Sequence, residues 1–203
     1  NRSELPLPHL PDIEVWCAND FRRYRKYLEN PLGTPHFTRW FNLHSRKHIE
    51  TTYPTGLEFP LKQDPAKPYY MLKHWSDIPA CRAFPRKDIQ AFFATAKGLN
   101  RYFTCTIAWQ LAFAVMEGFN RIELWGYELS DRIPKKNWGY ERPCFFYWIT
   151  QARNRGITVT YQQEIADLPF IAGDPDAYDG PLYGYSTKPE DDWDPQIEDF
   201  TTH

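Results

Sequence analysis

Three short groups of polar residues in this chain of 203 residues have the types and positions that ligand binding or catalysis requires. Thr104, Cys105 and Thr106 stand where an apolar helix is expected to begin, and the free N–H groups of a helix start attract anions. Asn19 and His44 each follow a predicted strand, at the end where open α/β sheets bind their ligands. Because amides both donate to phosphate oxygens and accept from ribose hydroxyls, this combination favours an anionic ligand such as a nucleotide.

Several of these residues also suit ordinary structural roles. Asn19 and Thr104 are good helix caps, and Gly126, after a further predicted strand, suits a simple turn. His44 titrates near neutral pH and is a candidate general base, but it also suits a packing or capping role. With His48 four residues later it would form a metal pair, but no HExxH motif or third acidic ligand accompanies the two, so we expect no metal.

The element that must position the helix-start residues is a predicted helix followed by a glycine stop and a strand. Ile107, Leu111 and Val115 recur at helical spacing, and Gly118 is expected to end the helix. The alternating residues 122–126 then predict a strand. The aromatic side chains of this helix and of a later one are expected in the core rather than stacked on bases.

The remaining elements are predicted from apolar periodicity and from the turn residues between them. Strands are expected at 13–17, 37–43, 69–72 and 157–161, and helices at 21–28, 45–49, 88–94 and 140–155. Asn19 or Asp20 would cap the first helix and Ser45 the second, and Pro143 would lie in the first turn of the last. Strands that alternate with helices predict a Rossmann-like α/β fold, with a mostly parallel sheet and helices on both faces.

Composition divides the chain into a basic body and an acidic tail. Residues 1–163 hold 23 Lys and Arg against 15 Asp and Glu, whereas residues 164–203 hold 1 against 11. We therefore expect a nucleotide-binding domain over 1–165, with a proline-dense, loop-rich insertion at 51–85 that holds only the 69–72 strand, and a largely irregular tail over 166–203. The first residues resemble the turn that follows a strand, so the first strand of the sheet is expected to be missing.

Several classes of function are not expected. The basic residues lack the clustering with aromatics that nucleic-acid binding needs, and no apolar run has membrane-spanning length. Cys17, Cys81, Cys105 and Cys144 form no CxxC pair and no zinc spacing, which favours reduced thiols in a cytoplasmic protein. The sequence indicates no particular oligomeric state.

Four segments carry a family resemblance: residues 1–5, 15–21, 104–106 and 122–128. In this order they resemble the nucleotide-site segments of the bacterial sialyltransferases of glycosyltransferase family forty-two. They are also similar to the related Rossmann-like hydroxymethylpterin diphosphokinases and to phage proteins of the same general pattern. The resemblance spans residues 1–165 by pattern and order, and its specific part is confined to the short motifs.

The resemblance implies roles for particular residues. Asn1 and Asn19 would contact the phosphates or ribose of a nucleotide, and residues 104–106 would cradle its phosphate or base. Asp20 and Gly126 belong to the same segments and complete the expected nucleotide site. In the matching catalytic region, Arg142 would clamp a phosphate or carboxylate and Tyr140 would donate to the departing phosphate. A first-turn surface ion pair is the ordinary alternative for Arg142.

One departure from the family concerns the general base. The sialyltransferases use a histidine after the strand equivalent to 122–124, whereas residues 127–161 here contain no histidine, so His44 becomes the candidate substitute.

The expected function is transfer from a nucleotide-activated donor, most closely by a nucleotide-sugar glycosyltransferase, with the donor as substrate and no cofactor. One alternative is a diphosphokinase-like phosphotransferase with Mg²⁺ held by Asp20, Glu128 and Asp131. The other is a nucleotide-binding protein without catalysis.

Overall fold

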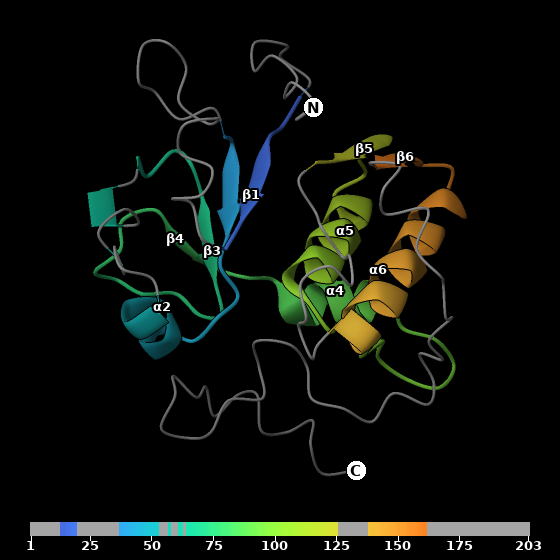
Figure 1. Cartoon of the computed structure of the whole chain (residues 1–203), viewed down its shortest axis with the longest axis horizontal. Helices are drawn as coiled ribbons and strands as arrows, with labels where there is room; N and C mark the ends of the chain where they lie inside the picture. The colour runs from blue at the N-terminus through green and yellow to red at the C-terminus, as the bar shows by residue number, and fades with distance from the viewer. Residues whose placement is uncertain are drawn as a thin grey trace. The chain divides into compact units, whose positions relative to one another are not determined.

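The computed structural model describes residues 13–19, 37–52, 57, 61–62, 64–125 and 138–161, with only the backbone for 138–140. The chain divides into two compact units between Phe84 and Pro85. We call the described residues up to Phe84 the N-terminal unit and those from Pro85 the C-terminal unit (Figure 1). Each unit is described by itself.

The N-terminal unit is built on a four-stranded parallel sheet. Its strands follow the chain in the order β1 (Trp16–Ala18), β2 (Arg39–Phe41), β3 (Tyr69–Met71) and β4 (Cys81–Ala83). Ala18 pairs with Phe41, and Phe41 pairs with Tyr70, so β1 and β2 end in register and β3 ends one residue later. Because all four strands are parallel, their carboxyl ends meet at one edge of the sheet.

The two faces of this sheet have different cores, because successive side chains of a strand point to opposite faces. One face packs against the helix α2 (Arg46–Thr52) through its buried residue Ile49. The buried cluster there comprises Phe37, Trp40, Ile49, Leu57, Tyr69, Met71, Ile78, Ala80 and Cys81. The other face is aromatic: Phe41 stacks on Tyr70 with ring centroids 5.0 Å apart, and Trp16 and Phe84 also contact Phe41.

Helix α2 is fixed at its start and along its exposed side. Ser45 accepts a hydrogen bond from the backbone N–H of His48 at 3.1 Å, which confirms the predicted N-cap. Arg46 pairs with both carboxylate oxygens of Asp77, each at 2.9 Å, and with Glu50 one turn along the helix at 2.8 Å. The connection between β3 and β4 is thereby tied to the helix.

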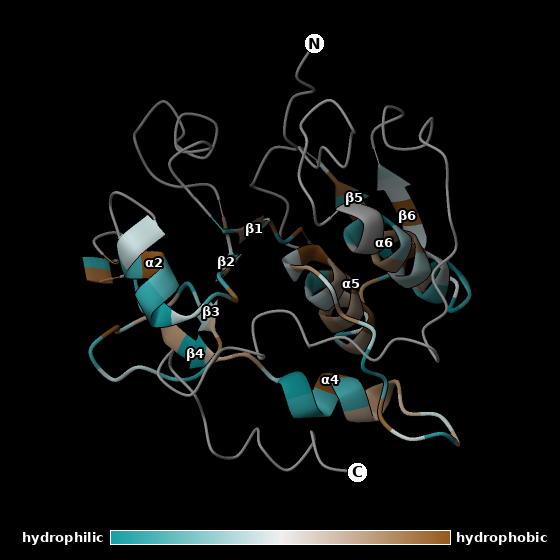
Figure 2. Ribbon diagram, turned by 60° about the horizontal axis from the view of Figure 1, so that its bottom comes forward, coloured by the Kyte–Doolittle hydropathy of each residue, from teal (hydrophilic) through white to brown (hydrophobic). Residues whose placement is uncertain are grey.

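The C-terminal unit consists of three helices and a pair of strands. In chain order they are α4 (Arg86–Phe92), α5 (Thr106–Met116), β5 (Arg121–Leu124), α6 (Trp138–Arg153) and β6 (Thr158–Tyr161). The strands β5 and β6 pair in parallel, with Ile122 opposite Val159. Figure 2 shows that α5 is more hydrophobic than α4, which begins with hydrophilic residues. Residues 106–115 of α5 are all buried.

A stack of aromatic rings forms the centre of this unit. Phe103 lies flat on Trp109, with centroids 3.6 Å apart, and it also stacks on Trp148 at 4.6 Å. Phe93 meets the same Trp148 edge-on at 4.7 Å. The expectation that the aromatic residues of α5 and α6 form core is confirmed at both tryptophans, which are fully buried.

The predicted glycine stop after α5 is confirmed by its hydrogen bonds. Gly118 has a φ of 84°, a conformation that favours glycine. The N–H of Phe119 donates to the carbonyl of Ala114, and that of Gly118 to Val115, both at 3.2 Å. This is the Schellman pattern, which satisfies carbonyls left unpaired at a helix end.

The predicted class, α/β with parallel strands, is confirmed, but three details were wrong. Residues 51–85, expected to hold one strand, also supply β4, whose three residues show no apolar alternation. Helix α6 begins at Trp138, so Pro143 lies in its second turn and withholds a backbone donor there. Helix α4 covers Arg86–Phe92 and not 88–94.

Other expectations concern residues outside the described ranges or find no support in the structure. The predicted helix 21–28, the first twelve residues and the tail from residue 166 lie outside the described residues. Open α/β sheets bind ligands where their strand order reverses, but the four strands of the N-terminal sheet follow one another without reversal. Among the helices of the described ranges, none has the length and apolar character needed to cross a membrane.

Candidate functional site

The carboxyl edge of the N-terminal sheet holds two of the predicted site residues. Asn19 follows β1 directly and has a φ of 56°, a left-handed conformation that asparagine tolerates better than most residues. Its N–H donates to the carbonyl of Phe41 at 2.8 Å, and its carbonyl accepts from the Trp40 indole at 3.3 Å. Both main-chain groups of Asn19 are therefore held by β2, which fixes the position of this residue at the strand end.

A second asparagine lies at the neighbouring strand end. Asn42 follows β2, is only 2% exposed, and donates its backbone N–H to Tyr70 at 2.9 Å. Its side-chain oxygen Oδ1 is buried and has no hydrogen-bond partner among the described residues. An unmet buried acceptor costs about 1–3 kcal/mol, so a donor from a ligand or a water molecule would be stabilising there.

His44 lies two residues beyond Asn42 and packs against His48 of α2, with ring centroids 4.6 Å apart. Burial of its imidazole, together with the neighbouring His48, lowers the pKa of His44 to about 4. His44 is thus uncharged at neutral pH and can accept a proton or a hydrogen bond. A base with this pKa is weak at pH 7, because proton transfer is most effective when the pKa lies near the working pH.

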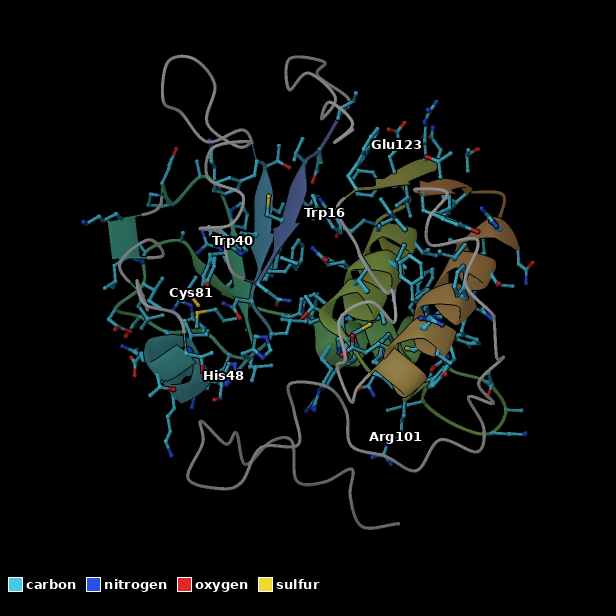
Figure 3. All side chains as sticks on the ribbon, in the orientation of Figure 1. Trp16, Trp40, His48, Cys81, Arg101 and Glu123 are labelled. Carbon is cyan, nitrogen blue, oxygen red and sulfur yellow. The ribbon has the colours of Figure 1, made fainter. Side chains whose placement is uncertain are left out.

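The end of β3 adds a positive charge to the same edge. Lys73 follows β3 by two residues, and its Nζ lies 4.4 Å from the ring centroid of Trp75. The adjacent His74 shares a hydrogen bond of 3.2 Å with the carbonyl of Cys81. Figure 3 shows Trp16 and Trp40 on the neighbouring strands β1 and β2, with His48 and Cys81 on the side of the sheet that α2 covers.

The predicted cradle at residues 104–106 belongs to the C-terminal unit and is buried. Thr104 is 9% exposed, Cys105 6% and Thr106 3%. The helix starts as expected, but Cys105 and not Thr104 occupies the N-cap position, and Cys105 makes no side-chain capping bond. The N–H of Thr104 donates to the sulfur of Cys144 at 3.4 Å, so this turn is bonded to α6.

Two thiols meet at this turn. The Cys105 S–H group donates a hydrogen bond to the Cys144 sulfur, and this bond and burial hold the pKa of Cys105 well above its ordinary value. Burial opposes ionisation of Cys144 too. Hydrogen bonds from Cys105 and Thr104 outweigh it, and the pKa of Cys144 is lowered.

The other predicted site residues are placed in part. Arg142 lies half-buried in the second turn of α6, and Tyr140 belongs to the first turn of the same helix, although its side chain is outside the description. Asn1, Asp20 and Gly126 lie outside the described residues, as do Glu128 and Asp131.

The structure thus brings Asn19 and His44 to one sheet edge, while residues 104–106 and Arg142 belong to the other unit. A single nucleotide site that uses both groups stays a prediction.

Sequence reasoning missed two residues that the structure singles out. Asn42 was seen only as part of a strand end, and its position directly after β2 was the signal that would have found it. Cys144 stands 39 positions after Cys105. No spacing rule connects cysteines so far apart, and only the packing of α6 on the turn before α5 brings them together.

The described ranges contain no group of three or more His, Cys, Asp or Glu side chains that could hold a metal ion. Comparisons of the whole chain with protein-family models, with curated proteins and with solved structures give no match.

Proposed function

We propose that this protein binds a nucleotide-activated donor at the carboxyl edge of its four-stranded parallel sheet and transfers the activated group. The most specific form of the proposal is a nucleotide-sugar glycosyltransferase on a Rossmann-like sheet with helices on both faces. The parallel strands support it by bringing their carboxyl ends, with Asn19 and Asn42, to one edge of the sheet.

The observation that carries the proposal is the pair of asparagines at adjacent strand ends. Asn19 is held in a left-handed conformation by two hydrogen bonds to β2, and Asn42 keeps a buried acceptor without a partner. A ribose hydroxyl or a base amino group is a donor of the kind that this acceptor lacks. Lys73 at the end of β3 adds the charge that a phosphate requires.

His44 serves as the general base in this proposal only after the ligand binds. Its low pKa follows from burial and from the neighbouring His48. A phosphate beside the imidazole would stabilise the protonated form and raise that pKa towards neutrality. The role at the departing phosphate that the sialyltransferase resemblance implies for Arg142 and Tyr140 stays a prediction, because both belong to the other unit.

The test is a calorimetric titration of the full chain with CMP, UDP, ADP and their sugar conjugates, with and without Mg²⁺. The proposal expects a sugar nucleotide to bind without added metal and to be hydrolysed or transferred. Binding that requires Mg²⁺ would favour the diphosphokinase alternative. Tight binding with no turnover for any acceptor would favour a nucleotide-binding protein without catalysis.

The matched variants are Asn42→Leu and Asn154→Leu. Leucine has the branched shape of asparagine but larger groups, so Asn42→Leu removes the unpaired amide oxygen without leaving a cavity and costs some packing energy at this buried position. We expect it to weaken nucleotide binding about tenfold and to lower the melting temperature. Asn154 is exposed after α6 and should change neither quantity. Unchanged nucleotide affinity in Asn42→Leu would mean that Asn42 takes no part in binding.

A further inference from the structure

The buried contact between Cys105 and Cys144 has no part in the function proposed above. All four cysteines of the chain are free thiols, and this pair is joined by a hydrogen bond between the two sulfur atoms. Cys105 immediately precedes α5, and Cys144 lies in the second turn of α6. Two helices of one unit therefore each bring a thiol to the same point.

The surroundings fix both sulfur atoms in place. The backbone N–H of Thr104 donates to the sulfur of Cys144 at 3.4 Å, and the Cys144 S–H group donates to the carbonyl of Tyr102 at 3.3 Å. The same carbonyl accepts from the Trp148 indole at 2.7 Å. These three hydrogen bonds attach residues 102–104 to α6 and hold the Cys144 sulfur beside the turn that carries Cys105.

The two thiols differ in their readiness to ionise. Hydrogen bonds from Cys105 and Thr104 lower the pKa of Cys144 against the effect of burial. The bond to Cys144, followed by burial, raises the pKa of Cys105. Since the thiolate is the nucleophile, the Cys144 sulfur attacks an oxidant first, and the Cys105 sulfur then attacks the oxidised Cys144.

We propose that Cys105 and Cys144 form a reversible disulfide in the folded protein when it meets hydrogen peroxide. The Cys144 thiolate attacks one peroxide oxygen, the O–O bond breaks, and the other oxygen leaves as water once protonated. The sulfur of Cys105 then attacks the sulfenic acid at Cys144, forming the S–S bond and releasing a second water. Two thiols lose two electrons and two protons, and the hydroperoxide takes up both.

Burial selects the size of the oxidant. Cys144 is fully buried and Cys105 is 6% exposed, so a molecule as small as hydrogen peroxide reaches the pair with the least opening of the fold. A dithiol reductant reverses the reaction by thiol–disulfide exchange.

The other two cysteines provide an internal comparison. Cys81 is buried, and its sulfur bonds the backbone N–H of Trp75 at 3.3 Å and the carbonyl of Lys73 at 3.5 Å, so no second sulfur is its partner in these bonds. Burial raises the pKa of Cys17 to about 12, which leaves almost no thiolate at neutral pH.

The experiment treats the reduced full chain with hydrogen peroxide under native conditions, removes the oxidant, and alkylates all remaining thiols in denaturant. Peptide mapping by mass spectrometry should show residues 105 and 144 linked, with the loss of two hydrogen atoms and no alkylation at either. Dithiothreitol should restore both alkylation sites. Cys17→Ser/Cys81→Ser should form the same link at the same rate.

Three outcomes would overturn the proposal. In the first, Cys105 and Cys144 are both alkylated after treatment that oxidises methionine in the same sample. In the second, the link forms only in urea, which assigns it to the unfolded chain. In the third, wild-type Cys144 is recovered as sulfinic acid with Cys105 still alkylated, since a resolving thiol in contact would have closed the disulfide first.

Discussion

Asn19 is the residue at which backbone geometry and proposed function can be separated most cleanly. Its φ of 56° is costly for most side chains and costs glycine nothing. Asn19→Gly therefore keeps the conformation and removes only the side-chain amide. We expect stability to change by a few tenths of a kcal/mol and nucleotide affinity to fall roughly ten- to a hundredfold, measured by denaturant unfolding and by calorimetry.

The companion variant Asn19→Ala supplies the control for Asn19→Gly. Alanine also lacks the amide but is strained at a positive φ, so it should lose the same affinity and about 1 kcal/mol of stability in addition. If Asn19→Gly binds nucleotide as tightly as the wild type, asparagine is present for its backbone conformation alone, and the transferase proposal loses its best-placed residue.

His44 makes a prediction about acid stability that does not depend on any ligand. The folded chain lowers the pKa of His44 from 6.5 to about 4, so between these values the unfolded chain binds a proton that the folded chain excludes. Stability from this group is fully present above about pH 6.5 and is lost as the pH falls to about 4, by roughly 2–3 kcal/mol.

Denaturant midpoints at pH 7 and pH 4.5 for His44→Gln measure this contribution, because glutamine does not titrate. The variant should lose less stability over this range than the wild type. Equal losses in the wild type and His44→Gln would show that the buried imidazole is not the titrating group.

At the scale of single elements, α2 is positioned by its cap. Ser45 accepts from the N–H of His48, and the helix that it starts carries Ile49 into the core and His48 against His44. Ser45→Ala should cost about 1 kcal/mol of stability, measured by denaturant unfolding. Thr51→Ala, at an exposed threonine whose hydroxyl bonds the preceding turn, should cost much less. Equal costs would assign the effect to helix propensity.

The elements of the C-terminal unit are fixed by helix ends and by aromatic stacking. Gly118 and Gly156 both take positive φ values, and each turns the chain from a helix into a parallel strand. Arg153 of α6 donates to the carbonyl of Val159 at 2.9 Å, so the helix also bonds the strand that follows it. The sequence signals a glycine stop at both places, and both helices end there.

At the scale of the whole molecule, the residues expected to hold one nucleotide are divided between two units. If both units contribute, Thr106→Val should weaken nucleotide binding as Asn19→Gly does, because it removes a hydroxyl from the predicted cradle. A saturating nucleotide at about a hundred times Kd should stabilise the wild type by about 2.7 kcal/mol, and each variant less at the same concentration.

Thermal unfolding with and without nucleotide measures these differences, and Thr150→Val is the matched control. Thr150 is exposed on α6, and its hydroxyl bonds only the backbone carbonyl of Phe146 among the described contacts. An unchanged thermal shift in Thr106→Val together with a reduced one in Asn19→Gly would confine the ligand to the N-terminal unit.

The sequence alone determined the local structure wherever a single residue type dictates the backbone. Gly118 ended a helix because glycine takes a positive φ without strain, Ser45 capped a helix because its hydroxyl reaches the first turn, and periodic apolar residues marked α5. The α/β class with parallel strands followed from the alternation of such segments, and so did the strand ends that carry Asn19 and His44.

Only the tertiary structure decided what depends on contacts between distant residues. Strand β4 has three residues and no apolar pattern. Its strand conformation therefore follows from pairing with the neighbouring strand β3 and not from its own sequence. The buried oxygen of Asn42, the low pKa of His44 and the contact between Cys105 and Cys144 arise from packing across the chain. Burial and hydrogen bonding set these properties, and both depend on which residues meet in space, which spacing along the chain does not specify.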